Sequence, residues 1–69
     1  MAVGDFARIL QLPSRPDLVR QTVKLVRFDE GTSRFGCRLT TGETLGIKAE
    51  NLQPLFGAFA DAARALFAE

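Results

Sequence analysis

Apolar and polar residues alternate along most of the first 48 positions of the chain. A two-residue period of this kind is typical of β-strands that bury one face. Two prolines between positions 13 and 17, and glycines at positions 31 and 42, interrupt the alternation, and such residues favour loops and tight turns. The pattern therefore predicts four strands, within residues 4–12, 22–28, 34–40 and 44–48.

The apolar positions of these strands also predict a pairing register. Leu25 opposite Cys37, and Leu39 opposite Leu45, would bring apolar side chains together on one face. A shift of one residue would turn them outward, so the register is well specified. The predicted inward-facing residues are Ala7, Ile9, Val23, Leu25, Cys37, Leu39, Leu45 and Ile47.

The last twenty residues follow a different period. The segment "ENLQP" at 50–54 predicts one helical turn that Pro54 stops, with a short fifth strand near residues 51–55. After it, phenylalanine and alanine recur at helical spacing, which predicts an amphipathic helix over about residues 56–68. A helix this short is marginal in water, so we expect it to dock on another surface.

Together these elements predict an all-β fold, a five-stranded SH3-like barrel with a C-terminal α-helix. The 69 residues suffice for a single domain, with the barrel over 4–55 and the helix over 56–69. A chain this short has a thin stability margin. One cysteine and no histidine predict no internal disulfide, no metal site and no cofactor, so association with a partner is the remaining source of extra stability.

Charge and hydropathy indicate where in the cell the protein is expected and whether it spans a membrane. Nine basic and eight acidic residues give a formal net charge of +1. The N-terminal sequence lacks a charged leader followed by a long apolar run, and no apolar stretch approaches the ~20 residues that cross a bilayer. We expect a soluble, intracellular protein without a membrane span.

Residues at characteristic spacings within positions 4–54 match the pattern of a known module. They are Gly4, Pro16, Leu18, Phe28 with Asp29, "RFGCRL" at 34–39, Gly42 with Glu43, Ile47 with Lys48, and Glu50 to Leu52 with Pro54. This set resembles an SH3-like barrel module that recurs in multidomain proteins of algae and other protists. The resemblance implies the barrel fold and an interaction role, without a defined activity. Val19 and Arg20 stand where the pattern has Asn-Gly, which implies a differently shaped loop after Pro16.

Residues that could support catalysis are sparse. Acid–base chemistry usually relies on histidine or on paired carboxylates in a cleft, and the carboxylates here fall in or beside turns. Cys37 could act as a nucleophile only with an activating base, and its inward position favours a packing role. We expect a protein that is not an enzyme and has no small-molecule substrate.

Two kinds of surface remain for recognition. An aromatic cage for methylated side chains is disfavoured because the chain has no tryptophan or tyrosine. Basic residues on the outward strand positions favour either a solvated exterior or contact with nucleic acid, as in a Tudor- or KOW-like barrel. The candidate nucleic-acid contacts are Arg8, Lys24, Arg38 and Lys48.

The C-terminal helix carries the leading functional hypothesis. It could cap its own barrel over outward apolar residues, or it could bury itself in a partner or in a second copy of the chain. We predict a non-enzymatic protein-interaction module, a small subunit or adaptor, with nucleic-acid binding as the alternative. The predicted protein-contact residues are Phe6, Val26, Phe28, Phe56, Phe59, Ala63, Leu66 and Phe67.

Overall fold

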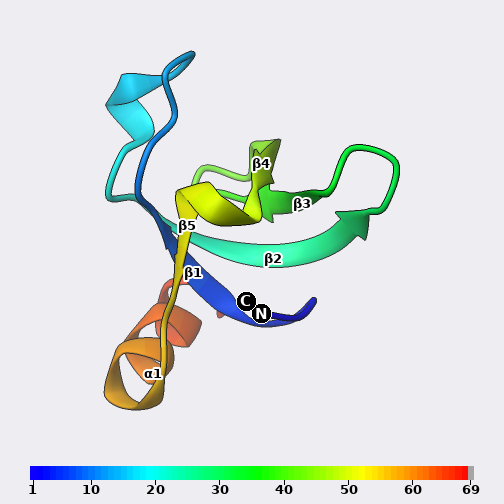
Figure 1. Ribbon diagram of the computed structural model, residues 1–69. Helices are drawn as coiled ribbons and strands as arrows, with labels where there is room; N and C mark the ends of the chain where they lie inside the picture. Colours follow the sequence, from blue (N-terminus) through cyan, green and yellow to red (C-terminus); the bar gives the residue numbers. More distant parts are fainter. Residues whose placement is uncertain (69) are drawn as a thin grey trace.

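The computed structural model describes residues 1–68 as one antiparallel sheet followed by a helix (Figure 1). The sheet has five strands in the order β4-β3-β2-β1-β5. The two edge strands, β4 and β5, are not paired with each other among the described residues, so the sheet is not closed as a barrel. The strands are β1 (Phe6–Ile9), β2 (Thr22–Asp29), β3 (Arg34–Arg38), β4 (Thr44–Lys48) and β5 (Leu52–Pro54).

Short helical segments connect or follow the strands. The 3-10 turn η1 (Pro16–Leu18) lies in the proline-containing loop, and η2 (Ala49–Asn51) joins β4 to β5. The helix α1 (Gly57–Leu66) is one to two residues shorter at each end than predicted. All elements expected from the sequence are therefore present, although β1 and β3 are shorter than the segments that the apolar pattern predicted.

Strand pairing agrees with the predicted register in part. Leu25 is opposite Cys37 as expected, whereas Cys37 is opposite Leu45, two residues away from the predicted partner. The reason is a three-residue loop, Thr40–Gly42, in which the Leu39 N–H donates to the Glu43 carbonyl at 2.8 Å and Gly42 has φ +94°. A shift of two residues leaves every side chain on its predicted face.

A β-bulge in β2 changes the face of the residues that follow it. The pairing steps from Leu25 opposite Cys37 to Arg27 opposite Gly36, so Val26 is the extra residue. Phe28 is then opposite Phe35, with ring centroids 4.8 Å apart. The prediction that Phe28 lies outward beside Phe6 and Val26 is therefore wrong, because simple alternation does not continue through a bulge.

The core lies against the inner face of the sheet. Cys37 and Ile47 are no more than 1% exposed, and Leu18 of η1 joins them from the loop after β1. The predicted inward set is confirmed, with Leu45 only partly buried. The buried cluster is Ala7, Ile9, Leu18, Val23, Leu25, Phe35, Cys37, Leu39, Ile47 and Leu52.

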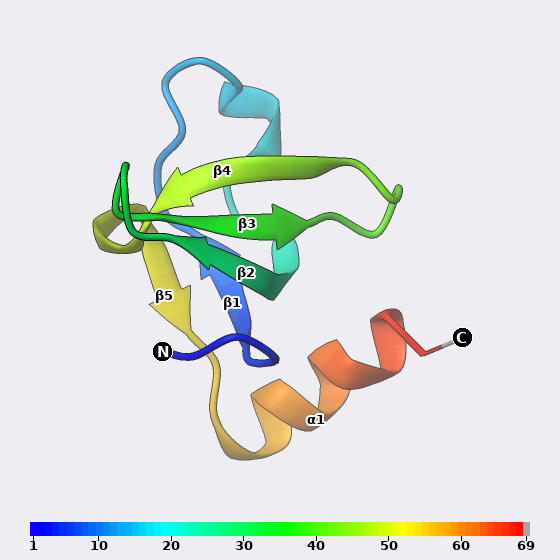
Figure 2. The same ribbon diagram turned by 90° about the vertical axis from the view of Figure 1, so that its right-hand side faces the viewer.

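The helix α1 lies on the opposite, outer face of the sheet, next to β1 (Figure 2). Gly57 has φ +55°, a conformation that suits glycine and reverses the chain after β5. Ala63 is buried in the contact, and the Phe67 ring packs on Phe6 with centroids 5.8 Å apart. The Arg64 guanidinium lies 5.9 Å from the centre of the Phe6 ring. The helix thus docks on its own sheet, as one of the two predicted arrangements requires.

Candidate functional site

The outer face of the sheet brings most of the candidate residues together. Strand alternation places Phe6 and Arg8 of β1, and Lys24 of β2, on this face, because Phe6 is opposite Lys24 while Ala7 and Val23 face the core. The helix α1 covers only the part of the face around Phe6. Three regions of the outer face remain accessible: the free side of α1, the cationic surface of β2, β3 and β4, and the hollows between them.

The free side of α1 and the residue that precedes the helix expose three large apolar side chains. Phe56 is 75% exposed, Phe59 is 68% exposed and Leu66 is 59% exposed. Phe59 and Leu66 are seven residues apart, which is two helical turns, so they lie along one flank of α1. We call Phe56, Phe59 and Leu66 the helix surface. Of the predicted contact residues, these three are free for a partner, while Phe6 is buried under α1 and Ala63 and Phe67 pack against the sheet. Phe28 is 45% exposed beside Phe35, and Val26 is half-buried at the bulge.

A cationic surface covers the outer side of β2, β3 and β4. Lys24 is opposite Arg38, and Arg34 is opposite Lys48 on one side and Asp29 on the other. Arg27 lies between these two pairs, with its side chain across Gly36. Within residues 1–68 none of these five cations forms an ion pair. We call Lys24, Arg27, Arg34, Arg38 and Lys48 the basic face.

The predicted nucleic-acid residues do not form one continuous stripe. Lys24 and Arg38 are direct cross-strand neighbours, whereas Lys48 lies with Arg34 at the other end of β3 and β4. Arg8 lies near the β1–β5 edge, where it lines a hollow with Gln53 and Phe59. Strand alternation predicted the outer face for all four residues. It did not predict that Arg27 and Arg34 share this surface, because their position depends on the bulge and on the β3–β4 register.

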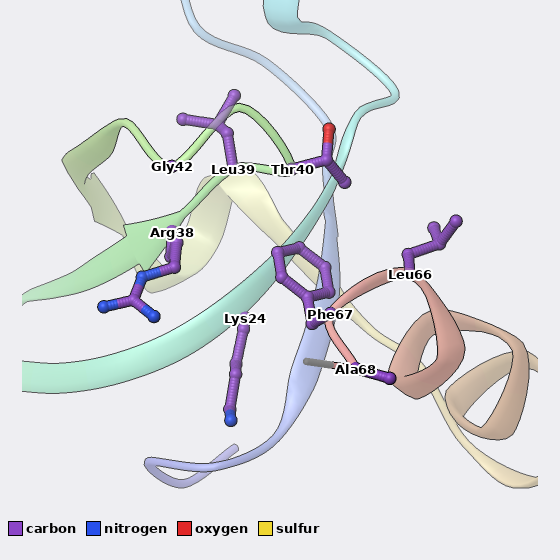
Figure 3. Close-up of a pocket in the computed structure, with 8 residues that line it drawn as sticks. All are labelled: Lys24, Arg38, Leu39, Thr40, Gly42, Leu66, Phe67 and Ala68. Carbon is purple, nitrogen blue, oxygen red and sulfur yellow. The ribbon is translucent and has the colours of Figure 1, made fainter.

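A hollow lies between the end of α1 and the β3–β4 hairpin (Figure 3). It has a volume of about 600 Å³. Cations line one side of it and apolar side chains another, and in Figure 3 the Phe67 ring stands between Leu66 and the two cationic side chains. We call this hollow the helix-end pocket; its lining residues are Lys24, Arg38, Leu39, Thr40, Gly42, Leu66, Phe67 and Ala68.

The acidic residue on that hairpin is engaged elsewhere. The Glu43 carboxylate accepts a hydrogen bond from the Arg15 guanidinium at 3.0 Å, and Arg15 also contacts Asp17 at 3.4 Å. Hydrogen bonds to Asp17 and then to Glu43 raise the pKa of Arg15. Glu43 therefore neutralises a cation of the first loop, and no residue that lines the helix-end pocket carries a carboxylate side chain.

Cys37 lies in the core and has no surface role. Its thiol is fully buried and contacts the Phe35 carbonyl at 3.5 Å. Burial raises the pKa of the thiol to about 11, because the thiolate would lose its hydration. The thiol is therefore protonated at neutral pH, which supports the packing interpretation over the nucleophilic one.

Neither a metal-type cluster nor a membrane-spanning helix is found in the part of the chain that the structure describes. No group of three or more Cys, Asp or Glu side chains gathers there in a way that could hold a metal ion. The helices within residues 1–68 are all too short to cross a bilayer.

Comparisons of the chain with protein-family models, with curated proteins and with solved structures found no match. The resemblance to the SH3-like module stays a prediction, and the geometry of the outer face is the basis for assigning a function.

Proposed function

We propose that the chain is a non-enzymatic protein-interaction module, a small subunit or adaptor, that contacts its partner through the helix surface. The observation that carries the proposal is that α1 is already docked by Ala63 and Phe67 and still exposes Phe56, Phe59 and Leu66. A helix that served only as a cap would need no large apolar residues on its free flank, where each costs solubility.

The fold that we propose for the module is an SH3-like barrel. The meander from β1 to β4, the 3-10 turn η2 before the last strand, and the pairing of β5 with β1 support this assignment. So does the apolar core on the inner face, to which η1 contributes Leu18. The resemblance of residues 4–54 to the module family agrees with the same assignment.

Light scattering and cross-linking together test the proposed function. The first measurement is the mass of the chain over a hundredfold range of concentration, for the wild type and for the double variant Phe59→Gln, Leu66→Gln. The second places a photo-activated cross-linker at position 59, and at Thr32 as a control in an exposed turn, in an extract of the host cell. We expect a dimer that the double variant loses, or a discrete adduct at position 59 that is absent at position 32. A monomer at all concentrations that forms no adduct at position 59 would contradict the proposal.

Nucleic-acid binding is the second candidate function, and the basic face favours it. Five cations that form no ion pair lie on one surface of the described chain, together with one carboxylate, Asp29, opposite Arg34. Phosphate contacts make affinity strongly dependent on salt. Binding of a single-stranded oligonucleotide that weakens steeply from about 50 to 200 mM salt would support this function, and no salt-dependent binding at the lower concentration would remove it.

A further inference from the structure

We propose that the helix-end pocket binds an acidic peptide segment in which carboxylates stand next to a large apolar side chain. The inference rests on the proposed interaction function and names the chemistry of the partner. It comes from three features of the pocket: its paired cations, its apolar wall, and the position of both beside the helix surface, which shares Leu66 with the pocket.

The paired cations supply the charge argument. Lys24 and Arg38 are directly opposite on adjacent strands, and like charges at opposed positions repel each other. Among residues 1–68 neither has a carboxylate within ion-pair distance, and the hairpin's Glu43 is bound to Arg15. A carboxylate seated between the two cations would replace this repulsion by two attractions, which is the electrostatic complementarity expected of a recognition site.

The apolar wall argues for a ligand that is more than an anion. Leu66 and Phe67, at the end of α1, form the apolar wall of the pocket, whereas the Leu39 side chain is buried in the core. Leu66 remains 59% exposed. A small anion such as phosphate would leave this side chain in water, whereas an apolar residue beside the carboxylates would cover it and gain free energy from the buried area.

The same geometry disfavours nucleic acid as the occupant of this pocket. Base stacking needs a free aromatic face, and the aromatic side chain that lines the pocket, Phe67, packs on Phe6. A phosphate backbone would follow a row of cations, and the cations next to Lys24 and Arg38, which are Arg27, Arg34 and Lys48, all lie outside the pocket. The pocket therefore fits a short segment with its charges at one end.

Fluorescence anisotropy with three defined probes tests the inference. The probes are a seven-residue peptide of alternating glutamate and leucine, the same peptide with glutamine for glutamate, and a twelve-nucleotide oligothymidine. The test protein is the double variant Lys24→Gln, Arg38→Gln. The matched control is the double variant Arg34→Gln, Lys48→Gln, which removes the same charge from a cross-strand pair on the same face but outside the pocket. Amide spectra of each variant establish that it is folded.

We expect the glutamate peptide to bind more tightly than the glutamine peptide. The double variant in the pocket should weaken that binding roughly three- to tenfold, the range for two partly exposed ion pairs, and the matched control less than about twofold. Leu66→Gln should also weaken it. In spectra of the labelled wild type, the amides of Lys24, Arg38, Thr40 and Phe67 should shift on addition of the peptide.

Three results would overturn the inference. The first is no binding of the glutamate peptide at millimolar concentration. The second is an equal loss of affinity for the glutamate peptide in both double variants, which would assign the binding to the basic face as a whole. The third is tighter binding of the oligothymidine that both double variants weaken. If position 59 still cross-links to a protein in any of these cases, the proposed function stands and only the chemistry of the partner is wrong.

Discussion

Arg20 has a backbone conformation that its side chain disfavours. Its φ is +75°, and its N–H donates to the Ile9 carbonyl at 2.7 Å, which fixes the start of the β1–β2 pairing. Residues with a Cβ are strained in this region by about 1–2 kcal/mol. Position 20 is also where the SH3-like pattern has a glycine. The backbone turn is thus formed here without the residue that suits it.

Replacing Arg20 with glycine should therefore stabilise the protein. We expect Arg20→Gly to be more stable than Arg20→Ala by about 0.5–1 kcal/mol, since relief of strain exceeds the added entropy of the unfolded chain. Both variants lose the same charge, so urea denaturation of the pair isolates the backbone effect. Equal stability, or a less stable glycine variant, would show that position 20 is not strained.

Cys37 makes the stability of the fold depend on pH in the alkaline range. Burial raises the pKa of its thiol from 9.0 to about 11 in the folded chain. The folded state therefore holds the proton to higher pH than the unfolded state. The stabilising effect of the protonated thiol is complete below pH 9 and decreases as pH rises towards 11.

The wild type should lose stability relative to Cys37→Ala between pH 9 and about 11. By pH 10 the difference should have fallen by about 1 kcal/mol, since one pKa unit corresponds to about 1.4 kcal/mol. Urea denaturation of both proteins at pH 7, 9 and 10 measures it, and subtraction removes the titration of lysines. A constant difference between the two proteins would mean that the thiol is not buried.

At the scale of elements, strand alternation predicted which side chains face the core but not how the strands end. The inward set from Ala7 to Ile47 followed from the two-residue period, because burial of one face imposes that period. The bulge at Val26 and the three-residue hairpin loop did not follow, since both depend on pairing geometry that one strand does not encode. These two features decide that Phe28 faces Phe35 and that Arg27 joins the basic face.

The helix α1 is held by few contacts, and its docking depends on a small residue. Its first residues lack a side-chain cap, and one ion pair, Arg64 to Asp61 at 3.0 Å, lies along its described length. A ten-residue helix is marginal alone. The close approach to the sheet occurs at Ala63, which is buried, with Phe67 on Phe6 one turn later.

A charge at Ala63 should undock α1, while the same charge one residue earlier should not. We expect Ala63→Asp to cost about 2 kcal/mol or more, because a carboxylate would be buried without a partner. Ala62 is exposed, so Ala62→Asp should cost less than about 0.5 kcal/mol beyond its helix propensity. Thermal denaturation followed by circular dichroism compares them. Equal losses in the two variants would mean that α1 does not dock through Ala63.

In the whole molecule, the two faces of the sheet differ in composition: the inner face is apolar, and the outer face carries the charged and exposed features. The inner face is a continuous apolar cluster without buried polar side chains among the described residues. The outer face carries α1, the basic face and the helix-end pocket. This arrangement leaves the core to provide stability and gives every recognition feature to the surface that α1 only partly covers.

Much of the candidate site could not be predicted from the sequence, because it depends on how α1 docks on the sheet. The helical spacing predicted the apolar residues of α1, but Phe59 and Phe67 look equivalent in that pattern, and only the docking geometry separates the exposed ring from the packed one. The helix-end pocket joins Leu39 and Thr40 of the hairpin to Leu66 of α1. Nothing local in either segment specifies that contact, because it depends on where the helix lies on the sheet.

Fluorine NMR of the six phenylalanines tests this division most directly. With fluorinated phenylalanine and a soluble paramagnetic agent in dilute solution, the structure predicts the strongest relaxation enhancement at Phe56 and Phe59 and the weakest at Phe6 and Phe35. Single Phe→Leu variants assign the six signals. A strongly enhanced Phe6 signal would show that α1 is not docked on the sheet, and protected Phe56 and Phe59 signals in the monomer would show that the helix surface is not available to a partner.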